Sequence, residues 1–308
     1  MNAFNIIFTT DFAFMVFRVT TPILFTALGA MISRRAGIMN ISLEGMMLVG
    51  ALFGVIGSAY TQSALVGVLC AVAASLVLSL VFAYFVLKLK SDLILTGIAL
   101  NLMASGGTVF LLSVLCGDKG VSTSLPSLVV PGIALPLIKD IPVLGDILSG
   151  HNLLTYLALL SVAAVYLLIN KSPLGLRIRS VGENPDAAES VGISVLKTRF
   201  IALMLTGILS GLGGAYMSMG YVSWFARDMA AGRGYIALAA QNLGNATPIG
   251  TFLASFLFGI ADAMSSSLQV LSIPAEFIQM VPYVTTVIGL ILYAMSLKRR
   301  AAKKTTAR

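Results

Sequence analysis

Long apolar runs recur along the whole chain, and each is near the roughly 20 residues that an α-helix needs to cross a bilayer core of about 30 Å. The run from Ala64 to Leu87 is the clearest example. Because 58% of the 308 residues are hydrophobic and only 10% are charged, the chain lacks the polar residues that would cover a separate soluble domain. The sequence therefore predicts an all-α membrane bundle that forms a single transmembrane domain over residues 1–308.

The predicted crossings number about nine, with one of them broken. The regular apolar segments lie at 13–32, 43–60, 63–87, 93–115, 152–170, 200–222, 248–268 and 276–297. A further candidate, 234–245, is too short for a regular span and contains Asn242, Gly244 and Asn245. An interrupted helix is tolerated at membrane depth only where protein buries it or where it lines a cavity. We therefore predict a broken helix here, buried by its neighbours.

Basic residues gather in four places along the chain. They are Arg34 with Arg35, Lys88 with Lys90, the segment 171–199 and the tail 298–308. Since Lys and Arg near span ends stay on the cytoplasmic side, these clusters predict a bacterial inner-membrane protein with its N-terminus outside and its C-terminus in the cytoplasm. An odd number of crossings then separates an outer turn near Arg227 from the tail, which requires the segment 234–245 to cross.

Several functional classes are disfavoured by the sequence. The net charge of +8 comes mainly from residues at span ends and in one tail, without the interleaved aromatic residues of a nucleic-acid-binding surface. The tail is better interpreted as an anchor that meets anionic lipid headgroups. No phosphate-binding Gly-x-x-x-x-Gly-Lys-Ser/Thr motif occurs, and His151 has no Cys/His cluster or nucleophile beside it in the sequence. We therefore expect a membrane protein with no enzymatic activity, no bound cofactor and no metal.

The centre of the segment 171–199 carries the signals of a short helix with both ends marked. Asn184 suits the N-cap, Pro185 the first helical position and Gly192 the left-handed stop. So short a helix is marginal in water alone, and its place between basic flanks indicates docking on a partner. An ordinary connecting loop is the alternative. The residues of this docking segment are Gly182, Glu183, Asn184, Pro185, Asp186, Ala187, Ala188, Glu189 and Gly192.

A few polar residues in or beside the apolar segments are candidates for the wall of a translocation path. An ionisable group inside a span is costly in lipid and usually faces protein or water, and amides offer donors and acceptors without a charge. Structural alternatives remain: Glu44 could pair with an arginine or cap the helix after it, Asp262 could bond a neighbouring helix, and Trp224 could join an aromatic belt. The candidates are Asn40, Glu44, Asn101, Trp224, Gln241, Asn242, Asn245 and Asp262.

Glycines recur at helical spacing in two spans. Gly50 and Gly54 form one small-xxx-small pair, and Gly207, Gly211 and Gly214 form a longer pattern. Such spacing lets two helix backbones approach closely. We therefore predict that these glycines serve helix packing and have no contact with substrate.

Three blocks of the chain have recognisable sequences. They are Gly37 to Ala51 (GIMNISLEGMMLVGA), Gly182 to Gly192 continuing to Gly214, and Gly232 to Ala240 (GRGYIALAA) with the later Pro248 and Gly250. These blocks resemble the permeases of ATP-binding-cassette (ABC) importers for nucleosides, ribose and branched-chain amino acids, and are most similar to the nucleoside branch. The resemblance covers about residues 15–297. The chain departs from the family pattern at Gln241 to Thr247, where relatives often carry bulkier or basic residues.

The resemblance implies a permease that moves nucleosides by alternating access, driven by a separate ABC ATPase subunit that docks on the segment from Gly182 to Gly192. It also implies a second, larger paralogous permease, giving a heterodimer, and a substrate-binding lipoprotein or periplasmic binding protein. Ribose-like simple sugars are the alternative substrates. A self-sufficient secondary transporter, coupled to an ion gradient through Glu44 and Asp262, is the alternative mechanism.

Overall fold

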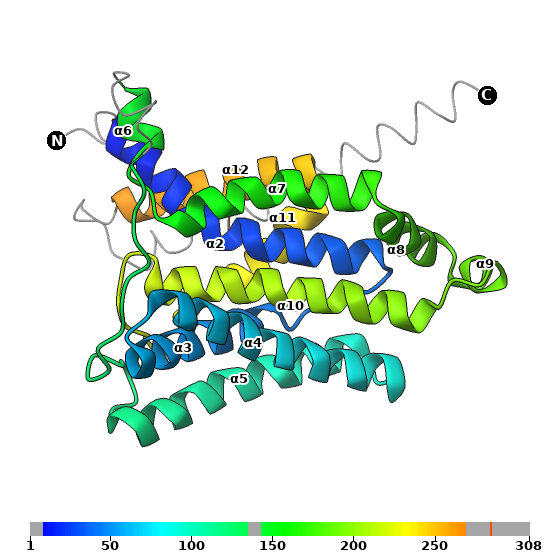
Figure 1. The fold of residues 1–308 in the computed structure, drawn as a ribbon, viewed down its shortest axis with the longest axis horizontal. Helices are drawn as coiled ribbons and strands as arrows, with labels where there is room; N and C mark the ends of the chain where they lie inside the picture. Colours follow the sequence, from blue (N-terminus) through cyan, green and yellow to red (C-terminus); the bar gives the residue numbers. More distant parts are fainter. Residues whose placement is uncertain (1–8, 135–142, 269–283, 285–308) are drawn as a thin grey trace.

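The computed structural model describes residues 9–134, 143–268 and Val284, and this part of the chain consists of helices joined by loops (Figure 1). Two isolated antiparallel bridges, Val121 with Ala226 and Gly132 with Asn152, tie loops together. The helices are α2 (Thr10–Arg35), α3 (Leu43–Thr61), α4 (Ala64–Ala83) with its π-helical continuation η1 (Tyr84–Lys88), α5 (Leu93–Cys116), α6 (Leu144–Leu148), α7 (Leu153–Lys171), α8 (Pro173–Glu183), α9 (Pro185–Ser190), α10 (Val195–Met219), α11 (Arg233–Leu243) and α12 (Pro248–Leu268).

Seven helices in the described ranges are long and apolar enough to cross a membrane. They are α2, α3, α4 continued by η1, α5, α7, α10 and α12, and they coincide with predicted regular spans. The predicted span at 276–297 lies outside the described residues, apart from Val284. The all-α membrane bundle predicted from the apolar runs is thereby confirmed.

Five long helices, α2, α4, α5, α7 and α10, begin where a polar side chain accepts a hydrogen bond from a first-turn N–H group. Asp92 accepts hydrogen bonds from the backbone N–H groups of Ile94 and Leu95, both at 2.9 Å, and Asn152 accepts one from Leu154 at 2.9 Å. A helix leaves these N–H groups without intrahelical partners, so a capping acceptor fixes its first residue. The sequence thus marks the starts of α5 and α7 locally.

α2 is the central helix of the bundle, and α7, α10, α11 and α12 pack around it (Figure 1). Every residue of α2 from Thr20 to Ser33 is buried. A helix that is mostly apolar around its whole circumference is expected at such a position, because it has no face that must meet water. α2 therefore holds α7, α10, α11 and α12 together in the described bundle.

The glycines of α10 lie in close contact with neighbouring helices. A Cβ atom added to Gly211 would lie 2.8 Å from the Cα atom of Val72 in α4, and one added to Gly214 would overlap the carbonyl oxygen of Met47 in α3. These contacts confirm the packing role predicted from the glycine spacing, since only a residue without a side chain permits this approach.

The two ends of the bundle are easily told apart. α8 and α9 project from one end, beside the last turn of α2, and α6 lies at the other end near the beginning of α2 (Figure 1). We call them the α9 end and the α6 end. The connection from η1 to α5 also lies at the α9 end, so the basic residues near Arg35, Lys88 and Lys171 share one end of the bundle (Figure 1).

We expect Gly214→Ala to destabilise the protein by about 1–3 kcal/mol or more, because the added methyl group meets backbone that cannot move without shifting α3. Gly106→Ala is the matched control, since no described heavy atom lies within 4 Å of its added methyl group. Alanine in a helix interior is favoured over glycine by about 0.5–1 kcal/mol, so this variant should be as stable as the wild type or more so. Melting temperatures in detergent measure both changes, and equal values for Gly214→Ala and wild type would contradict the packing role.

Candidate functional site

The predicted broken crossing is α11, reached by a loop at 220–232 that turns back into the bundle from the α6 end (Figure 1). The 11 residues of α11 span about 16 Å at 1.5 Å per residue, roughly half of a 30 Å bilayer core. Most of the helix is buried, including Ile236 and Gln241. After a turn, α12 begins at Pro248. The short, interrupted and buried segment predicted at 234–245 is therefore confirmed.

The first turn of α11 is capped by a carboxylate from another helix. Glu44 of α3 accepts hydrogen bonds from the backbone N–H groups of Gly232, at 2.8 Å, and Gly234, at 2.7 Å. Such N–H groups need a partner inside the protein at membrane depth, and a negative charge is favoured at the N-terminal end of a helix. A Cβ atom on Gly234 would lie 2.5 Å from the backbone nitrogen of Glu44, so glycine is required for this approach.

Asn101 of α5 connects the beginning of α3 with the beginning of α11. Its side-chain oxygen accepts a hydrogen bond from the Gly45 N–H at 2.8 Å. Its side-chain nitrogen donates to the Ile41 carbonyl oxygen at 2.9 Å and to the Tyr235 hydroxyl at 3.0 Å. The amide therefore uses both its donor and its acceptor capacity between two helix ends. We call Glu44, Asn101, Gly232, Gly234 and Tyr235 the polar node.

The structure corrects the expected depth of the Asn40–Glu44 block. In the sequence this block closely follows the basic pair Arg34 and Arg35, a position that predicts a membrane boundary, but the connection from α2 runs back along the bundle before α3 begins (Figure 1). Asn40 is buried, and its side-chain oxygen accepts from the backbone and hydroxyl groups of Ser42 at 2.9 and 2.7 Å. Within the described ranges, Glu44 neither pairs with an arginine nor caps its own helix. Its two carboxylate oxygens instead accept hydrogen bonds from the Gly232 and Gly234 N–H groups at the beginning of α11.

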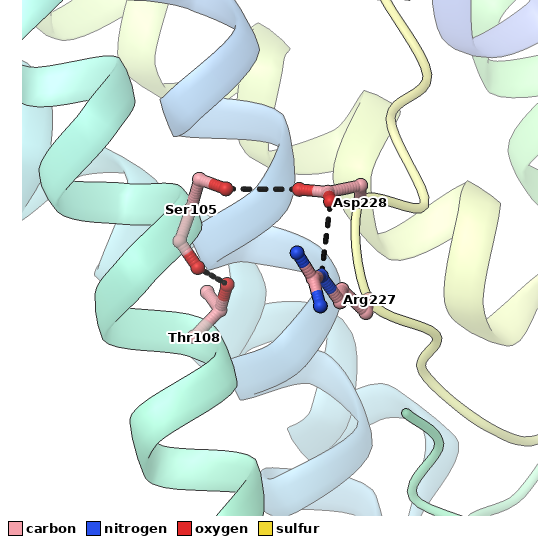
Figure 2. Close-up of polar contacts among 4 residues, drawn as sticks. All are labelled: Ser105, Thr108, Arg227 and Asp228. Carbon is pink, nitrogen blue, oxygen red and sulfur yellow. Dashed lines mark hydrogen bonds and ion pairs between the residues drawn. The ribbon is translucent and has the colours of Figure 1, made fainter. Parts of the chain in front are cut away.

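An exposed ion pair lies beside the middle of α5. Figure 2 shows the carboxylate of Asp228 between the hydroxyl of Ser105, which donates to it at 2.9 Å, and the guanidinium of Arg227 at 3.3 Å. The side chains of Arg227 and Asp228 are 64% and 54% exposed in the described chain. We call Ser105, Arg227 and Asp228 the path cluster. The sequence placed Arg227 in an outer turn, and the loop that carries it instead returns alongside α5 (Figure 2).

The loop before α11 has an unusual backbone. Asp228 and Ala231 have φ values of +52° and +47°, a region that residues other than glycine rarely enter, and Gly232 follows at +81°. Backbone strain of this kind persists only where the surroundings fix it, and it is concentrated at functional sites. Here the bond from Ser105 to Asp228 and the bond from Gly232 to Glu44 hold the loop from both sides.

Asp262 faces the bundle, as the sequence predicted for an acid inside a span. Its carboxylate lies 3.2 Å from the guanidinium of Arg233, the first residue of α11, and the two side chains are 15% and 26% exposed. The pair ties α12 to α11, which is the structural alternative considered for Asp262. Opposite charges that are this extensively buried stabilise one another as a pair.

The remaining candidates lie apart from the polar node. Trp224 is half-buried in the loop before α11, and Gln241 is buried and donates to the Asn242 side chain at 2.7 Å. Asn245 is exposed in the turn between α11 and α12, at the far end of α11. Sequence reasoning missed Ser105, Asp228 and Tyr235 as polar groups that lie beside α5 and the beginning of α11. The available signal was the Arg227–Asp228 pair directly before a short, glycine-flanked helix.

A cavity of about 380 Å³ lies on the other side of the loop, between α2, α10 and α12. Its lining includes Arg18, whose guanidinium lies 3.9 Å from the centre of the Tyr221 ring, and Arg233. The volume falls in the range of ligand pockets. Arg233 is already paired with Asp262, and Arg18 lies over the Tyr221 ring, so the charged groups of the cavity have partners within the described chain.

The predicted docking helix is present as α9. The Asn184 side chain accepts from the Ala187 N–H at 3.1 Å, Pro185 occupies the first turn, and Gly192 ends the turn with a φ of +82°. Ala188 is buried, whereas Asp186 and Glu189 are exposed. The sequence did not predict α8, although Ser172 caps it at 3.0 Å and Pro173 follows directly.

No group of three His, Cys, Asp or Glu side chains is arranged for metal binding within the described ranges. Cys70 and Cys116 are free thiols, each half-buried. The chemistry available near the path is therefore that of hydroxyl, amide, carboxylate and guanidinium groups.

A family model described as the branched-chain amino acid transport system / permease component matches residues 12–296. The chain belongs to this permease family. The permease is 36% identical over 282 residues to the guanosine ABC transporter permease protein NupQ of Bacillus subtilis (strain 168), with 87% of each chain covered. It is 35% identical over 285 residues to the nucleoside ABC transporter permease protein NupC of Lactococcus lactis subsp. cremoris (strain MG1363), with 89% of each covered.

Two further comparisons extend this result. The glucose ABC transporter permease protein TsgB13 of Haloferax volcanii is 26% identical over 279 residues, covering 84% of the permease and 71% of that protein. Among solved structures, an ABC transporter in an inward-facing conformation matches with a TM-score of 0.53 at 16% identity, covering 94% of the permease and 85% of that chain. This second likeness shows that the fold is shared.

We expect Glu44→Gln to lower the stability of the permease by about 1–3 kcal/mol, because glutamine has one acceptor oxygen for the two N–H groups of α11 and turns a donor toward one of them. Glu183→Gln is the matched control, since this glutamate is exposed. Thermal unfolding in detergent measures both. A Glu44→Gln variant as stable as Glu183→Gln would show that the cap contributes nothing.

Proposed function

We propose that the permease is a membrane subunit of an ATP-driven importer that moves nucleosides by alternating access, along a path beside α5. The observation that carries this proposal is the path cluster. An ion pair with more than half of each side chain exposed, level with the middle of a membrane-spanning helix, is too costly to face lipid. It must meet either water or a second protein, and a path between two permease subunits supplies both.

The chemistry of the path cluster and the polar node suits an uncharged polar substrate. The Tyr235 ring is 47% exposed next to Asn101, and Ser105 and Asp228 offer a hydroxyl and a carboxylate on the same side of the bundle. Ribose hydroxyls can donate to such acceptors, and a base can stack on an aromatic ring. The guanosine and nucleoside permeases among the relatives support this substrate class.

The relative named as a glucose permease supports simple sugars as the second candidate substrate class. A sugar would use the same hydroxyl and carboxylate groups but has no aromatic face to stack on Tyr235. Competition between a nucleoside and a sugar for uptake therefore separates the two classes.

We infer that α9 docks on a separate ABC ATPase and that the α9 end faces the cytoplasm. The basic residues gathered at this end support the orientation, with the N-terminus outside and the C-terminal tail inside. A second, paralogous permease would cover the path cluster, and a binding protein would deliver substrate at the α6 end. ATP would bind to the partner subunit, with no cofactor held by this chain.

The contacts of the two partly buried acids Glu44 and Asp262 argue against an ion-coupled secondary transporter. Glu44 accepts from two backbone N–H groups, and Asp262 pairs with Arg233. An acid that carries protons or ions through a transport cycle must exchange its partners, and here an exchange would uncap α11 or leave a guanidinium unpaired. Energy from an external ATPase requires neither change.

The function is tested in proteoliposomes that contain the permease with its paralogue, ATPase and binding protein. We expect uptake of labelled guanosine to require internal ATP and to exceed uptake of ribose or glucose at least tenfold. Sugar uptake above guanosine uptake would show that simple sugars, and not nucleosides, are the substrate class. Uptake by the permease alone, driven by an ion gradient, would contradict the importer function.

We expect Glu189→Arg to reduce the stimulation of ATP hydrolysis by loaded binding protein at least fivefold, because it inverts a charge on the exposed face of α9. Glu189→Asp, which keeps the negative charge at the same position, is the control and should leave the coupling to the ATPase intact. Wild-type stimulation in the Glu189→Arg complex would rule out this face of α9 as the docking surface.

A further inference from the structure

We propose that Arg35 is a positioning residue that connects the α8–α9 segment to α11, so that movement of α9 reaches the polar node through the length of α11. This proposal rests on the proposed function and assigns a specific side chain to the transmission of movement. Arg35 lies in the last turn of α2 at the α9 end, whereas α11 begins at the polar node and ends in the turn that Arg35 contacts.

The α8–α9 segment presses directly on the last turn of α2. Gly182, at the end of α8, packs so closely that a Cβ atom there would overlap the carbonyl oxygen of Arg35. A Cβ atom on Gly37, which has a φ of +80°, would lie 3.4 Å from the Cα atom of Gly182. Arg199 of α10 donates through Nε to the Ala36 carbonyl oxygen at 3.3 Å. Residues 35–37 are therefore in backbone contact with the segment that we expect the ATPase to move.

The side chain of Arg35 contacts a second segment, the turn between α11 and α12. Its Nε donates to the carbonyl oxygen of Ala246 at 2.6 Å. The turn has two consecutive residues other than glycine in the left-handed region, Asn245 with a φ of +54° and Ala246 with a φ of +46°. Such a backbone persists only where contacts stabilise it, and a charge-assisted hydrogen bond is a strong contact. Arg35 is well placed to hold this turn in its observed form.

α11 then links this turn to the polar node. The Ala246 N–H donates to the Gln241 carbonyl oxygen at 2.9 Å, so the turn is part of the end of α11. The first turn of the same helix is held by Glu44. A helix of 11 residues, packed along α2 through Ala237 and Ala240, moves as a unit. A displacement at Ala246 therefore reaches Tyr235 and the loop that carries Asp228.

Arg34 provides a matched control next to Arg35. It carries the same charge at the same end of the bundle, and its side chain is exposed with no hydrogen bond or ion pair to another described residue. Removal of either arginine changes the basic cluster equally. Only removal of Arg35 breaks the connection between α2 and the turn after α11.

The test compares Arg35→Ala and Arg34→Ala in the complete importer, with ATP hydrolysis and guanosine uptake measured in the same proteoliposomes. We expect Arg35→Ala to hydrolyse ATP within about twofold of wild type but to take up at least tenfold less guanosine per ATP. Arg34→Ala should match wild type within about twofold in both measurements. An unchanged ratio of uptake to hydrolysis in Arg35→Ala would overturn the proposal.

A second variant covers the case in which Arg35→Ala does not assemble. Arg35→Leu keeps an apolar stem without a donor: an assembled complex with a ratio at least tenfold lower supports the proposal, and a normal ratio or failed assembly overturns it. Wild-type uptake that does not depend on ATP would contradict the proposed function itself. ATP-driven wild-type uptake with a normal ratio in the variant contradicts only the role of Arg35.

Discussion

The carboxylate of Glu44 at the N-terminus of α11 is the interaction on which the rest of the site depends. A helix that begins inside a membrane exposes N–H groups that lipid cannot satisfy. Because Glu44 satisfies two of them, α11 can be short, the loop before it can turn back into the bundle, and Asp228 can lie beside Ser105. Without this cap, the broken crossing would have no stable starting point.

The cap also explains why polar groups gather on one side of the bundle. Asn101 connects α3 and α11, and the point where α11 begins determines the positions of Tyr235 and Asp228. Around them, α5 presents large exposed apolar side chains such as Leu102 and Phe110. A surface that is apolar with a charged centre suits a second subunit that closes around a wet path, whereas lipid would accept only the apolar part. The incomplete path of one chain is thus consistent with an importer built from two permeases.

Local signals made most of the fold predictable from the sequence. Apolar length gave the spans, Asn184 and Pro185 marked the beginning of α9, and the parity of crossings required a broken helix at 234–245. The site was less predictable, because its contacts join residues far apart in the chain. The bond between Glu44 and Gly232 links segments 188 positions apart, and no local pattern gives such a pairing. Arg227 and Asp228 had the sequence of an outer turn, and only the return of the loop brings them to membrane depth.

The most direct test of the path beside α5 is the labelling of a cysteine at Ser105 by a membrane-impermeant thiol reagent in the assembled importer, with Cys70 and Cys116 replaced by alanine. A cysteine at Leu160, which is 64% exposed on α7, serves as the lipid-facing control. The path predicts that Ser105→Cys is labelled, that guanosine slows the labelling, and that Leu160→Cys does not react. If Ser105→Cys is as unreactive as Leu160→Cys, or reacts at a rate that guanosine does not change, the substrate does not pass beside α5.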